Sequence, residues 1–371
     1  MNGTKPANGI LPVQQIQAAI DAGMITADNG IDAAQMQPAS LDLRLGEEAW
    51  RVQASFLPGR GMSVTDKLDK FAMHRINLRD GAVLECGCVY IVKLQESLRL
   101  PDDISALANP KSSTGRLDIF TRLITDRAVE FESVAPGYEG PLYAEISPRT
   151  FSVLVRPGSR LSQLRLRRGP AVISDDAMHE LQATTGLVHG SEAPDIRDGV
   201  GLSVNLSPDE TSGMIGWRAR KHAGLVDIDA PRSCAVNAYW EKLTEADLTA
   251  GGLVLNPDEF YILASREYVT VPKGYAAEMR AYDTRVGEFR AHYAGFFDPG
   301  FGMPELNAAR TRAVLEVRSH DVPFLIEQGQ TVCRLVYEPM SAVPDSLYGD
   351  VGSTSNYQSQ GLRLAKHFIQ D

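Results

Sequence analysis

The sequence has few cysteines and no long apolar segment. Only 4 of its 371 residues are Cys, too few for a disulfide framework, which favours a reduced cytoplasmic setting. No run of about 18 apolar residues is present, so we expect no membrane-spanning helix. The N-terminal stretch MNGTKPANGILPVQQ lacks the apolar centre of a signal peptide. We therefore expect a cytoplasmic protein without a membrane partner.

Basic residues are fewer than acidic residues. Lys and Arg total 37 against 47 Asp and Glu, which gives a formal net charge of −10. Proteins that bind nucleic-acid polymers usually carry a basic face, so this charge argues against that class. It leaves room for a small basic pocket that binds one anionic ligand. The 43% of apolar residues is ordinary for a globular chain, and the length fits two or three domains or one module used twice.

Several cofactor motifs are missing. A zinc nucleoside deaminase needs His-x-Glu and Pro-Cys-x-x-Cys, and none of the 7 His is followed by x-Glu. Cys86 and Cys88 are two residues apart, on one face of a predicted strand, and are expected to be packed thiols. The Walker loop and the dinucleotide-binding fingerprint are absent, which weakens kinase, ATPase and dehydrogenase interpretations.

Short alternating runs between turns predict a mainly β protein. Val13, Ile16, Ile20 and Met24 share one face of a helix predicted within 10–25. The remaining segments are strands from 40 to 169, a helix at 174–185 that begins at Ser174, a linker at 186–222, strands from 224 to 339, and a polar tail.

An internal repeat organises these segments. VYIVKLQESLRLPDDISA, which begins at Val89, resembles FYILASREYVTVPKGYAA, which begins at Phe260. The interval that separates these two segments also separates Glu145 from Glu316 and Gly158 from Gly329. We infer two copies of one β module. The expected boundaries are 1–170 for the first module, 171–222 for a helix and linker, and 223–371 for the second module.

The segment KSSTGR, from Lys111 to Arg116, is a candidate phosphate loop. Two hydroxyls lie between two cations, and Gly115 permits close approach of the backbone. Cations, hydroxyls and N–H groups are the donors that bind phosphate. A solvated turn is the alternative for this string.

Glu145 and Glu316 are each placed in the middle of an apolar strand. On such a strand the side chain points away from its apolar neighbours, so a position on the solvated face is one interpretation. A half-buried carboxyl with a raised pKa, acting as a general acid and base, is the other.

Two further segments have functional and ordinary interpretations. AHYAGFFDPGF, from Ala291 to Phe301, predicts a tight hairpin whose backbone could read a flat ring and whose Asp298 could bind a hydroxyl; an ordinary hairpin is the alternative. SNYQSQG, from Ser355 to Gly361, is either a closing lid or a mobile terminus.

Together these motifs resemble the dCTP deaminase family of the dUTPase superfamily. SLDLRLG, KSSTGR, HYAGFFDPGF followed by Glu316, and NYQSQG occur in that family's order, and the similarity covers most of 8–170 and 224–366. The resemblance implies two distorted β-barrel modules with a few short helices. It also implies rings of three modules with sites between modules, and hence a homo-oligomer of three chains carrying six modules.

Each copy departs from the family pattern. The first copy has Ala135 where the hairpin Asp is expected. The second keeps Arg280 and Arg285 but has Ala281 and Tyr282 in place of two Ser. A composite site, with the phosphate loop of copy one facing the hairpin of copy two, would repair both losses.

The resemblance implies hydrolytic deamination of dCTP to dUTP and ammonia, which feeds dUMP and dTTP synthesis. Mg²⁺ would accompany the triphosphate, mainly on its phosphates, and no zinc would take part. Catalysis would involve Glu316, Ser112 and Arg116, with Glu145 as the copy-one counterpart. The implied substrate-binding residues are Lys111, Ser113, Arg280, Arg285, His292, Tyr293, Ala294, Asp298, Phe301, Tyr357 and Gln360.

Three other activities stay open at this stage. A dUTP diphosphatase would use Asp298 to position water for attack on phosphorus, and a bifunctional enzyme would combine both reactions. A non-catalytic regulator that binds deoxynucleoside triphosphates is the third. The candidate ligands are thus dCTP, dUTP and dTTP.

Overall fold

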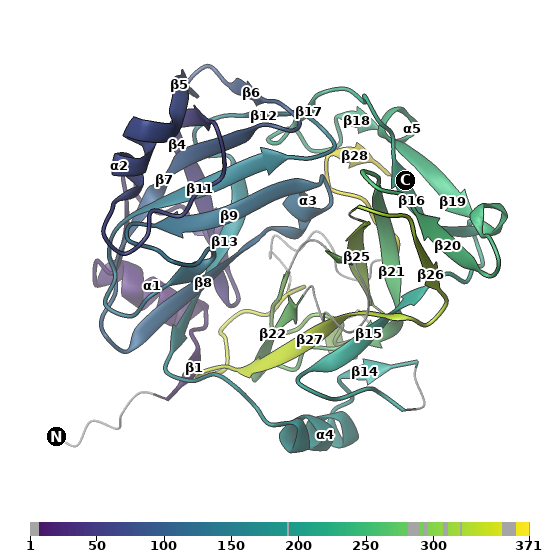
Figure 1. Ribbon diagram of the computed structural model, residues 1–371. Coiled ribbons are helices and arrows are strands. Elements are labelled where there is room, and N and C mark those ends of the chain that lie inside the picture. The colour runs from purple at the N-terminus through teal and green to yellow at the C-terminus, as the bar shows by residue number, and fades with distance from the viewer. Residues whose placement is uncertain are drawn as a thin grey trace.

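The computed structural model describes residues 7–190, 193–280, 290–291, 295–306, 311–319, 321–350 and 361–370. Within these residues the chain is mainly β, as the sequence predicts, and it forms two sets of strands. Figure 1 shows the first set in purple to blue on the left and the second in teal to yellow on the right. No helix in this part of the chain is long and apolar enough to cross a membrane.

The first set forms one large sheet in the order β10-β8-β13-β4-β7-β11-β9. Its strands are β4 (Ser40–Val52), β7 (Val89–Arg99), β8 (Ile104–Pro110), β9 (Ile119–Thr125), β10 (Ser133–Val134), β11 (Glu139–Pro148) and β13 (Arg160–Arg168). Shorter strands flank it: β1 (Gly9–Ile10), β2 (Ile25–Ala27), β3 (Met36–Gln37), β5 (Ala72–Asn77), and the pair β6 (Ala82–Leu84) and β12 (Val153–Val155). The helices are α1 (Val13–Asp21), α2 (Val64–Phe71) and the single turn α3 (Ser112–Gly115).

The second set repeats this plan in the order β19-β16-β21-β15-β27-β22-β24, with β25 also paired to β21. Its strands are β14 (Val188–His189), β15 (Val200–Asn205), β16 (Met214–Ala219), β19 (Trp240–Thr244), β20 (Gly252–Leu255), β21 (Phe260–Val269), β22 (Tyr275–Arg280), β23 (Arg290–Ala291), β24 (Phe296–Phe297), β25 (Arg312–Arg318), β26 (Phe324–Glu327) and β27 (Thr331–Pro339). The remaining elements are α4 (Asp175–Thr184), α5 (Val236–Tyr239), β17 (Val226–Asp227), β18 (Cys234–Ala235) and β28 (Phe368–Ile369).

The strand register reproduces the repeat. Glu145 on β11 lies opposite Ile91 on β7, and Glu316 on β25 lies opposite Ile262 on β21, with both members displaced by the repeat interval. The pair β6–β12 and the pair β20–β26 follow the same displacement. The two modules therefore share backbone pairing as well as sequence, and the two mid-strand glutamates occupy equivalent places.

The linker expected over 186–222 is wrong, because β14, β15 and β16 fall within it. Strand β4 of the first module is a single strand of 13 residues, whereas β15 and β16 divide its role in the second. At Gly216 the missing side chain serves close packing rather than flexibility. A Cβ on Gly216 would lie 2.5 Å from the Leu263 side chain and 2.9 Å from the Ile262 carbonyl oxygen.

The second module also begins before the expected boundary at 223. Helix α4 starts after Ser174, whose hydroxyl accepts the Ala177 N–H at 3.2 Å, as the sequence predicts. The short strand after α4 pairs Val188 with Val269, just as the strand after α1 pairs Ile25 with Leu98. Helix α4 is thus the counterpart of α1 and opens the second module.

One further expectation needs correction. Cys86 and Cys88 lie in the turn between β6 and β7 rather than on one strand face, and Cys86 is exposed.

The end of the chain beyond the SNYQSQG segment packs against the rest of the protein, because β28 pairs with β18 and Phe368 is buried. Its ring lies 5.8 Å from that of Trp240, in a cluster of edge-to-face aromatic contacts.

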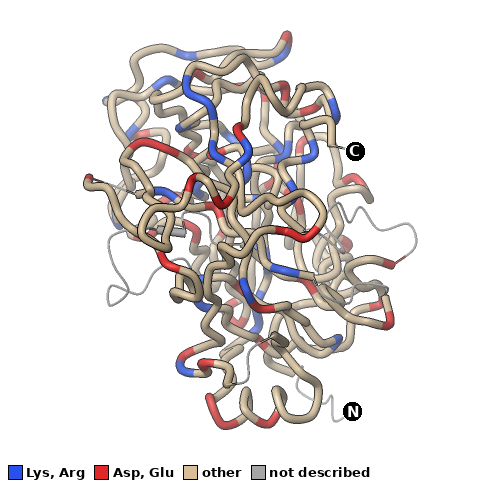
Figure 2. The backbone as a smooth tube through the Cα atoms, turned by 90° about the vertical axis from the view of Figure 1, so that its right-hand side faces the viewer, with Lys and Arg blue, Asp and Glu red and all other residues tan. Residues whose placement is uncertain are grey.

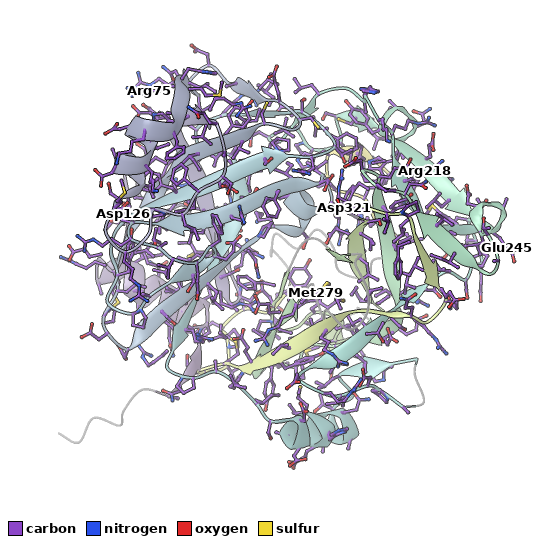
Figure 3. The ribbon with its side chains drawn as sticks, viewed as in Figure 1. Arg75, Asp126, Arg218, Glu245, Met279 and Asp321 are labelled. Carbon is purple, nitrogen blue, oxygen red and sulfur yellow. The ribbon has the colours of Figure 1, made fainter. Side chains whose placement is uncertain are left out.

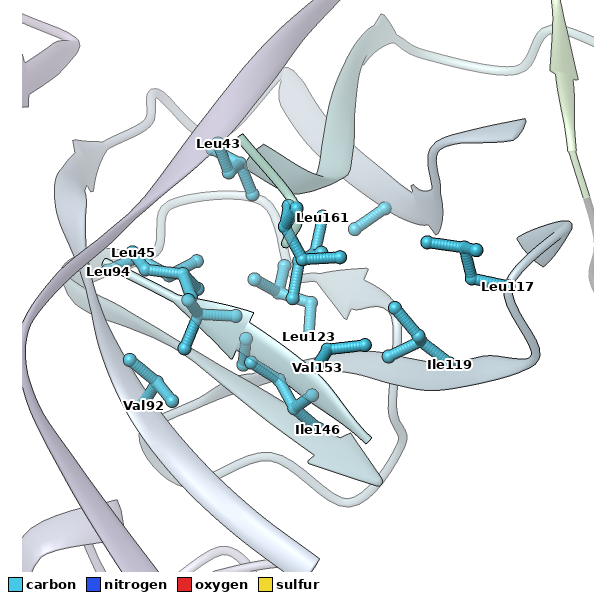
Figure 4. Packing of buried hydrophobic residues seen from close by; sticks show 14 of the residues in the cluster. Leu43, Leu45, Val92, Leu94, Leu117, Ile119, Leu123, Ile146, Val153 and Leu161 are labelled. Carbon is cyan, nitrogen blue, oxygen red and sulfur yellow. The ribbon is translucent and has the colours of Figure 1, made fainter. Parts of the chain in front are cut away.

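The main apolar core begins in the first module and extends into the second. Figure 4 shows part of it, with Leu43, Leu94, Leu123 and Ile146 among the labelled residues. Side chains of the second module belong to the same cluster, namely Trp217, Trp240, Phe260, Ile262 and Val314. Because burial of apolar area drives association, the two modules are held together by a shared core.

The charged residues are spread along the whole chain. Figure 2 shows Lys and Arg interspersed with Asp and Glu along the chain. One pair that joins the modules is deeply buried: Arg318 donates to Asp118 Oδ2 at 3.0 and 2.9 Å, and Asp118 is fully buried. Two N–H bonds that converge on one carboxylate oxygen fix the geometry of both partners.

We predict that Arg318→Met destabilises the protein by about 3–5 kcal/mol, because it removes the guanidinium that compensates the charge of the fully buried Asp118 carboxylate. Arg79→Met is the control, since the Arg79–Glu47 pair is exposed and should matter little. The free energy of unfolding in guanidinium chloride measures both. Equal stability of the two variants would contradict this role.

Candidate active site

A cavity of about 450 Å³ lies between the two modules. The first module contributes the loop from Lys111 to Arg116 and the strand residues Arg160 and Gln163. The second contributes the hairpin and Glu316, and the C-terminal segment adds Lys366 and His367. Met279, labelled in the centre of Figure 3, lies on its wall. One chain therefore supplies both halves of this cavity.

The KSSTGR segment is built into the protein, so the solvated-turn alternative is wrong. It connects β8 to β9 through the single turn α3. Ser113 and Thr114 are buried, and Arg116 is only 3% exposed. The Arg116 guanidinium donates to the Arg363 carbonyl at 2.8 Å, which joins this loop to the C-terminal segment.

Glu316 reaches the cavity from the middle of β25. Its neighbours Leu315 and Val317 pack into the core of the second module, so the alternation of the strand turns Glu316 the other way. The carboxyl is 6% exposed, and its Oε1 lies 3.8 Å from Arg116 Nε. Burial raises the pKa of Glu316 to about 7, against the opposing influence of Arg116. A solvated position is thus excluded.

Glu145, its counterpart, has a different environment. It is 1% exposed, and its Oε1 accepts from Arg122 Nη2 at 2.6 Å and from Arg122 Nε at 3.1 Å. It does not line the cavity. The solvated position is excluded for this residue too, and its partner is a structural arginine.

The hairpin supplies an apolar wall that ends in a carboxylate. The Phe297 and Phe301 rings meet edge to face with their centroids 4.9 Å apart, and Tyr348 packs beside Phe301. Asp298 follows β24 and is 8% exposed. Its Oδ1 accepts from Arg165 Nη2 at 3.1 Å, and Arg165 comes from the first module.

Three basic side chains line another part of the cavity. Lys111 forms an ion pair with Asp42, and Arg160 Nη1 lies 3.7 Å from the same carboxylate. Lys366 faces this group. Burial and the nearby Lys111 lower the pKa of Lys366. Like charges brought together in this way favour an anionic ligand.

Sequence reasoning missed several lining residues. Arg160 and Gln163 are in the repeated segment RPGSRLSQLRL and could have been selected from it, and Asp42 is in SLDLRLG. Lys366 and His367 had no such signal, because only the pairing of β28 with β18 brings them to the cavity.

The structure brings together many of the candidate residues, including Lys111, Ser112, Ser113, Arg116, Asp298, Phe301 and Glu316. Arg280 is exposed at the end of β22 and does not line the cavity. The candidates Arg285, His292, Tyr293, Ala294, Tyr357 and Gln360 lie outside the described residues.

The carboxylates of the cavity are already matched with cations. Asp42 pairs with Lys111, Asp298 with Arg165, and Glu316 with Arg116. Over the described ranges, no three His, Cys, Asp or Glu side chains are grouped as metal ligands.

Comparison with known proteins places these features in one family. The family model for the 2′-deoxycytidine 5′-triphosphate deaminase (DCD) N-terminal domain matches residues 7–170. The model for the C-terminal domain of the same family matches residues 174–368.

The curated relatives match part of the chain. A dCTP deaminase of Haloarcula marismortui is 33% identical over 132 residues, which are 35% of this chain and 65% of the relative. A dUMP-forming dCTP deaminase of Methanosphaera stadtmanae is 30% identical over 158 residues, which are 42% of this chain and 77% of the relative.

One solved structure matches this chain over most of its length. The crystal structure of 2′-deoxycytidine 5′-triphosphate deaminase from Agrobacterium tumefaciens has 53% sequence identity and a TM-score of 0.85, and the match covers 90% of this chain and 99% of that one. With the tandem plan and the family models, this shows that the chain belongs to the dCTP deaminase family.

Proposed function

We propose that the protein deaminates dCTP to dUTP and ammonia at the cavity between its modules. The observation that carries this proposal is the meeting of Arg116 of the first module with Glu316 of the second, at 3.8 Å. A buried carboxyl with a pKa of about 7 is suited to both accepting and donating a proton near neutral pH.

In the proposed reaction, Glu316 removes a proton from a water molecule while the water oxygen forms a bond to C4 of cytosine and the C4=N3 double bond opens onto N3. The same carboxyl then returns the proton to the C4 amino group. The bond between C4 and the amino nitrogen breaks as the C4=N3 bond re-forms, ammonia leaves, and the proton of the remaining C4 hydroxyl moves to N3 to give uracil. The apolar wall at Phe297 and Phe301 excludes bulk water from this step.

Ser112 and Arg116 orient the water and stabilise the charge that develops on the base. The Arg116 guanidinium is positioned for this, because the Arg363 carbonyl holds its other end. In this proposal the backbone from His292 to Ala294 reads the base edge, and Asp298 accepts from the sugar 3′-hydroxyl.

Lys111 and Ser113 bind the phosphates, and Tyr357 and Gln360 close over them from the C-terminal segment. Mg²⁺ bound to the triphosphate would neutralise phosphate charge. The basic end of the cavity, which includes Arg160 and Lys366, supports this placement of the phosphates.

A second candidate product is dUMP, because the Methanosphaera relative is named for forming it. Ammonia with dUTP would support the deaminase, ammonia with dUMP and pyrophosphate the bifunctional enzyme, and binding without turnover a regulator. A homo-oligomer of three chains stays part of the proposal, and light scattering measures it.

We predict that Glu316→Gln lowers kcat by roughly 10²–10⁴-fold, because the ionisable group is lost while the shape is nearly kept. Glu145→Gln is the matched control. It should keep kcat and lose stability, because Arg122 loses its charged partner. Ammonia release and dCTP binding are measured separately. The reverse ranking of the two kcat values would assign catalysis to the first copy.

The rate should fall in acid with a midpoint near pH 7. Glu316 acts first as a base, so protonation below its pKa of about 7 removes activity, and kcat/KM reports this value for the free enzyme. Arg116 lowers that pKa, so Arg116→Met should move the midpoint to higher pH. A midpoint near 4.5, or a shift to lower pH, would argue against Glu316 as the base.

Turnover should require Mg²⁺ and survive a zinc-selective chelator, because the proposed base needs no metal-bound water. Ammonia release is followed after chelation and after adding each metal back. Loss of activity on removal of stoichiometric zinc, with recovery only on zinc addition, would refute this chemistry.

A further inference from the structure

Arg165 lies behind the hairpin and away from the cavity surface. It is fully buried, although its strand β13 belongs to the first module and the hairpin to the second. Its neighbours Leu164 and Leu166 pack into the core of the first module, so Arg165 points from the other face of the strand toward the second. A buried cation is costly unless its donors are matched.

The second module supplies partners for both terminal nitrogens of the guanidinium. Arg165 Nη1 donates to the Ala277 carbonyl at 3.0 Å, and Nη2 donates to Asp298 Oδ1 at 3.1 Å. The guanidinium carbon lies 3.9 Å from the centroid of the Phe296 ring, a cation–π contact. Glu338 adds a longer ion pair at 3.8 Å. Arg165 thus joins strand β22 to the ring and the carboxylate of the hairpin at one point.

The repeat has no second copy of the Arg165–Asp298 pair, because neither equivalent position keeps the same residue. Arg165 lies opposite Leu107, and the corresponding pair in the second module is Val336 opposite Glu278, displaced by the repeat interval. In the first module Ala135 follows the strand that corresponds to β24. The module fold therefore does not need an arginine at this position, and the arginine accompanies the hairpin that carries the aspartate.

We propose that Arg165 is a positioning residue that sets the preference for a nucleotide with a 3′-hydroxyl. It holds Oδ1 of Asp298, which leaves Oδ2 to accept from the sugar at the cavity wall. The inference rests on the proposed function, since it takes the ligand to be a deoxynucleotide. Burial raises the pKa of Asp298, and Arg165 is the strongest influence that lowers it.

The test compares binding of dCTP with binding of 2′,3′-dideoxycytidine triphosphate, which lacks the hydroxyl. The unaltered protein should prefer dCTP by about 10–100-fold, the range for a hydrogen bond to a charged group. Arg165→Met should bring this ratio close to 1. Its effect on ammonia release should appear mainly in KM, because Arg165 does not touch the reacting atoms.

Arg167→Met is the matched control. Arg167 is on the same strand, and its carboxylate partner is Glu338, at 3.8 Å, rather than Asp298. This variant should keep the preference for dCTP. Arg165→Lys is the second variant if Arg165→Met does not fold. It keeps the charge but cannot donate as a planar fork to both acceptors, so the ratio should still fall.

An unchanged ratio in Arg165→Met, or in Arg165→Lys, would overturn the inference and leave Arg165 a purely structural residue. Equal binding of the two nucleotides by the unaltered protein would also overturn it, while ammonia release would still support the deaminase. A clear preference for dCTP without ammonia release would refute the proposed function alone and leave the role of Arg165 in place.

Discussion

Charge buried between the two modules controls the geometry of the site. Arg116 and Asp118 follow α3 in the first module, and Glu316 and Arg318 alternate along β25 in the second. Two ion pairs therefore cross the interface, Arg116 with Glu316 and Arg318 with Asp118. The first module supplies the cation of one pair and the anion of the other. The second pair is short and two-pronged, whereas the first is long at 3.8 Å. The short pair fixes how the two modules sit against each other, and in the proposed reaction the longer pair leaves the Glu316 carboxyl available for proton transfer.

Duplication explains how one chain came to contain a composite site. The modules share backbone pairing at one constant displacement along the chain, yet the side chains have diverged around one interface. The copy-one glutamate is held by Arg122, while the copy-two glutamate faces the cavity. The C-terminal segment then returns across the first module, where Phe368 is buried and Lys366 reaches the basic end of the cavity. Neither module alone supplies all the side chains that line the cavity.

The sequence predicted what depends on local pattern and missed what depends on packing. The β class follows from the short-range alternation of apolar and polar residues, and the helix cap follows from the residue type at Ser174. The repeat follows from the similarity of segments within the sequence. The linker was wrong because Gly216 packs tightly against β21, and composition alone reads such glycines as flexible. The roles of Arg165 and Lys366 could not be assigned, since what places them is distant in the chain: Asp298 for Arg165, and the pairing of β28 with β18 for Lys366. The local sequence does not distinguish a charged strand residue that faces solvent from one that faces the other module.

The central claim is that one chain supplies both halves of the site, and a mixing measurement tests it most directly. Arg116→Met and Glu316→Gln chains are prepared separately, then co-expressed, and ammonia release from dCTP is measured for each preparation. If every site combines residues of a single chain, each chain in the mixture still carries one substitution in its site, and the mixture is no more active than its parents. If the sites form between chains, some pair an intact Arg116 with an intact Glu316. A substantial regain of activity on co-expression would therefore contradict the account.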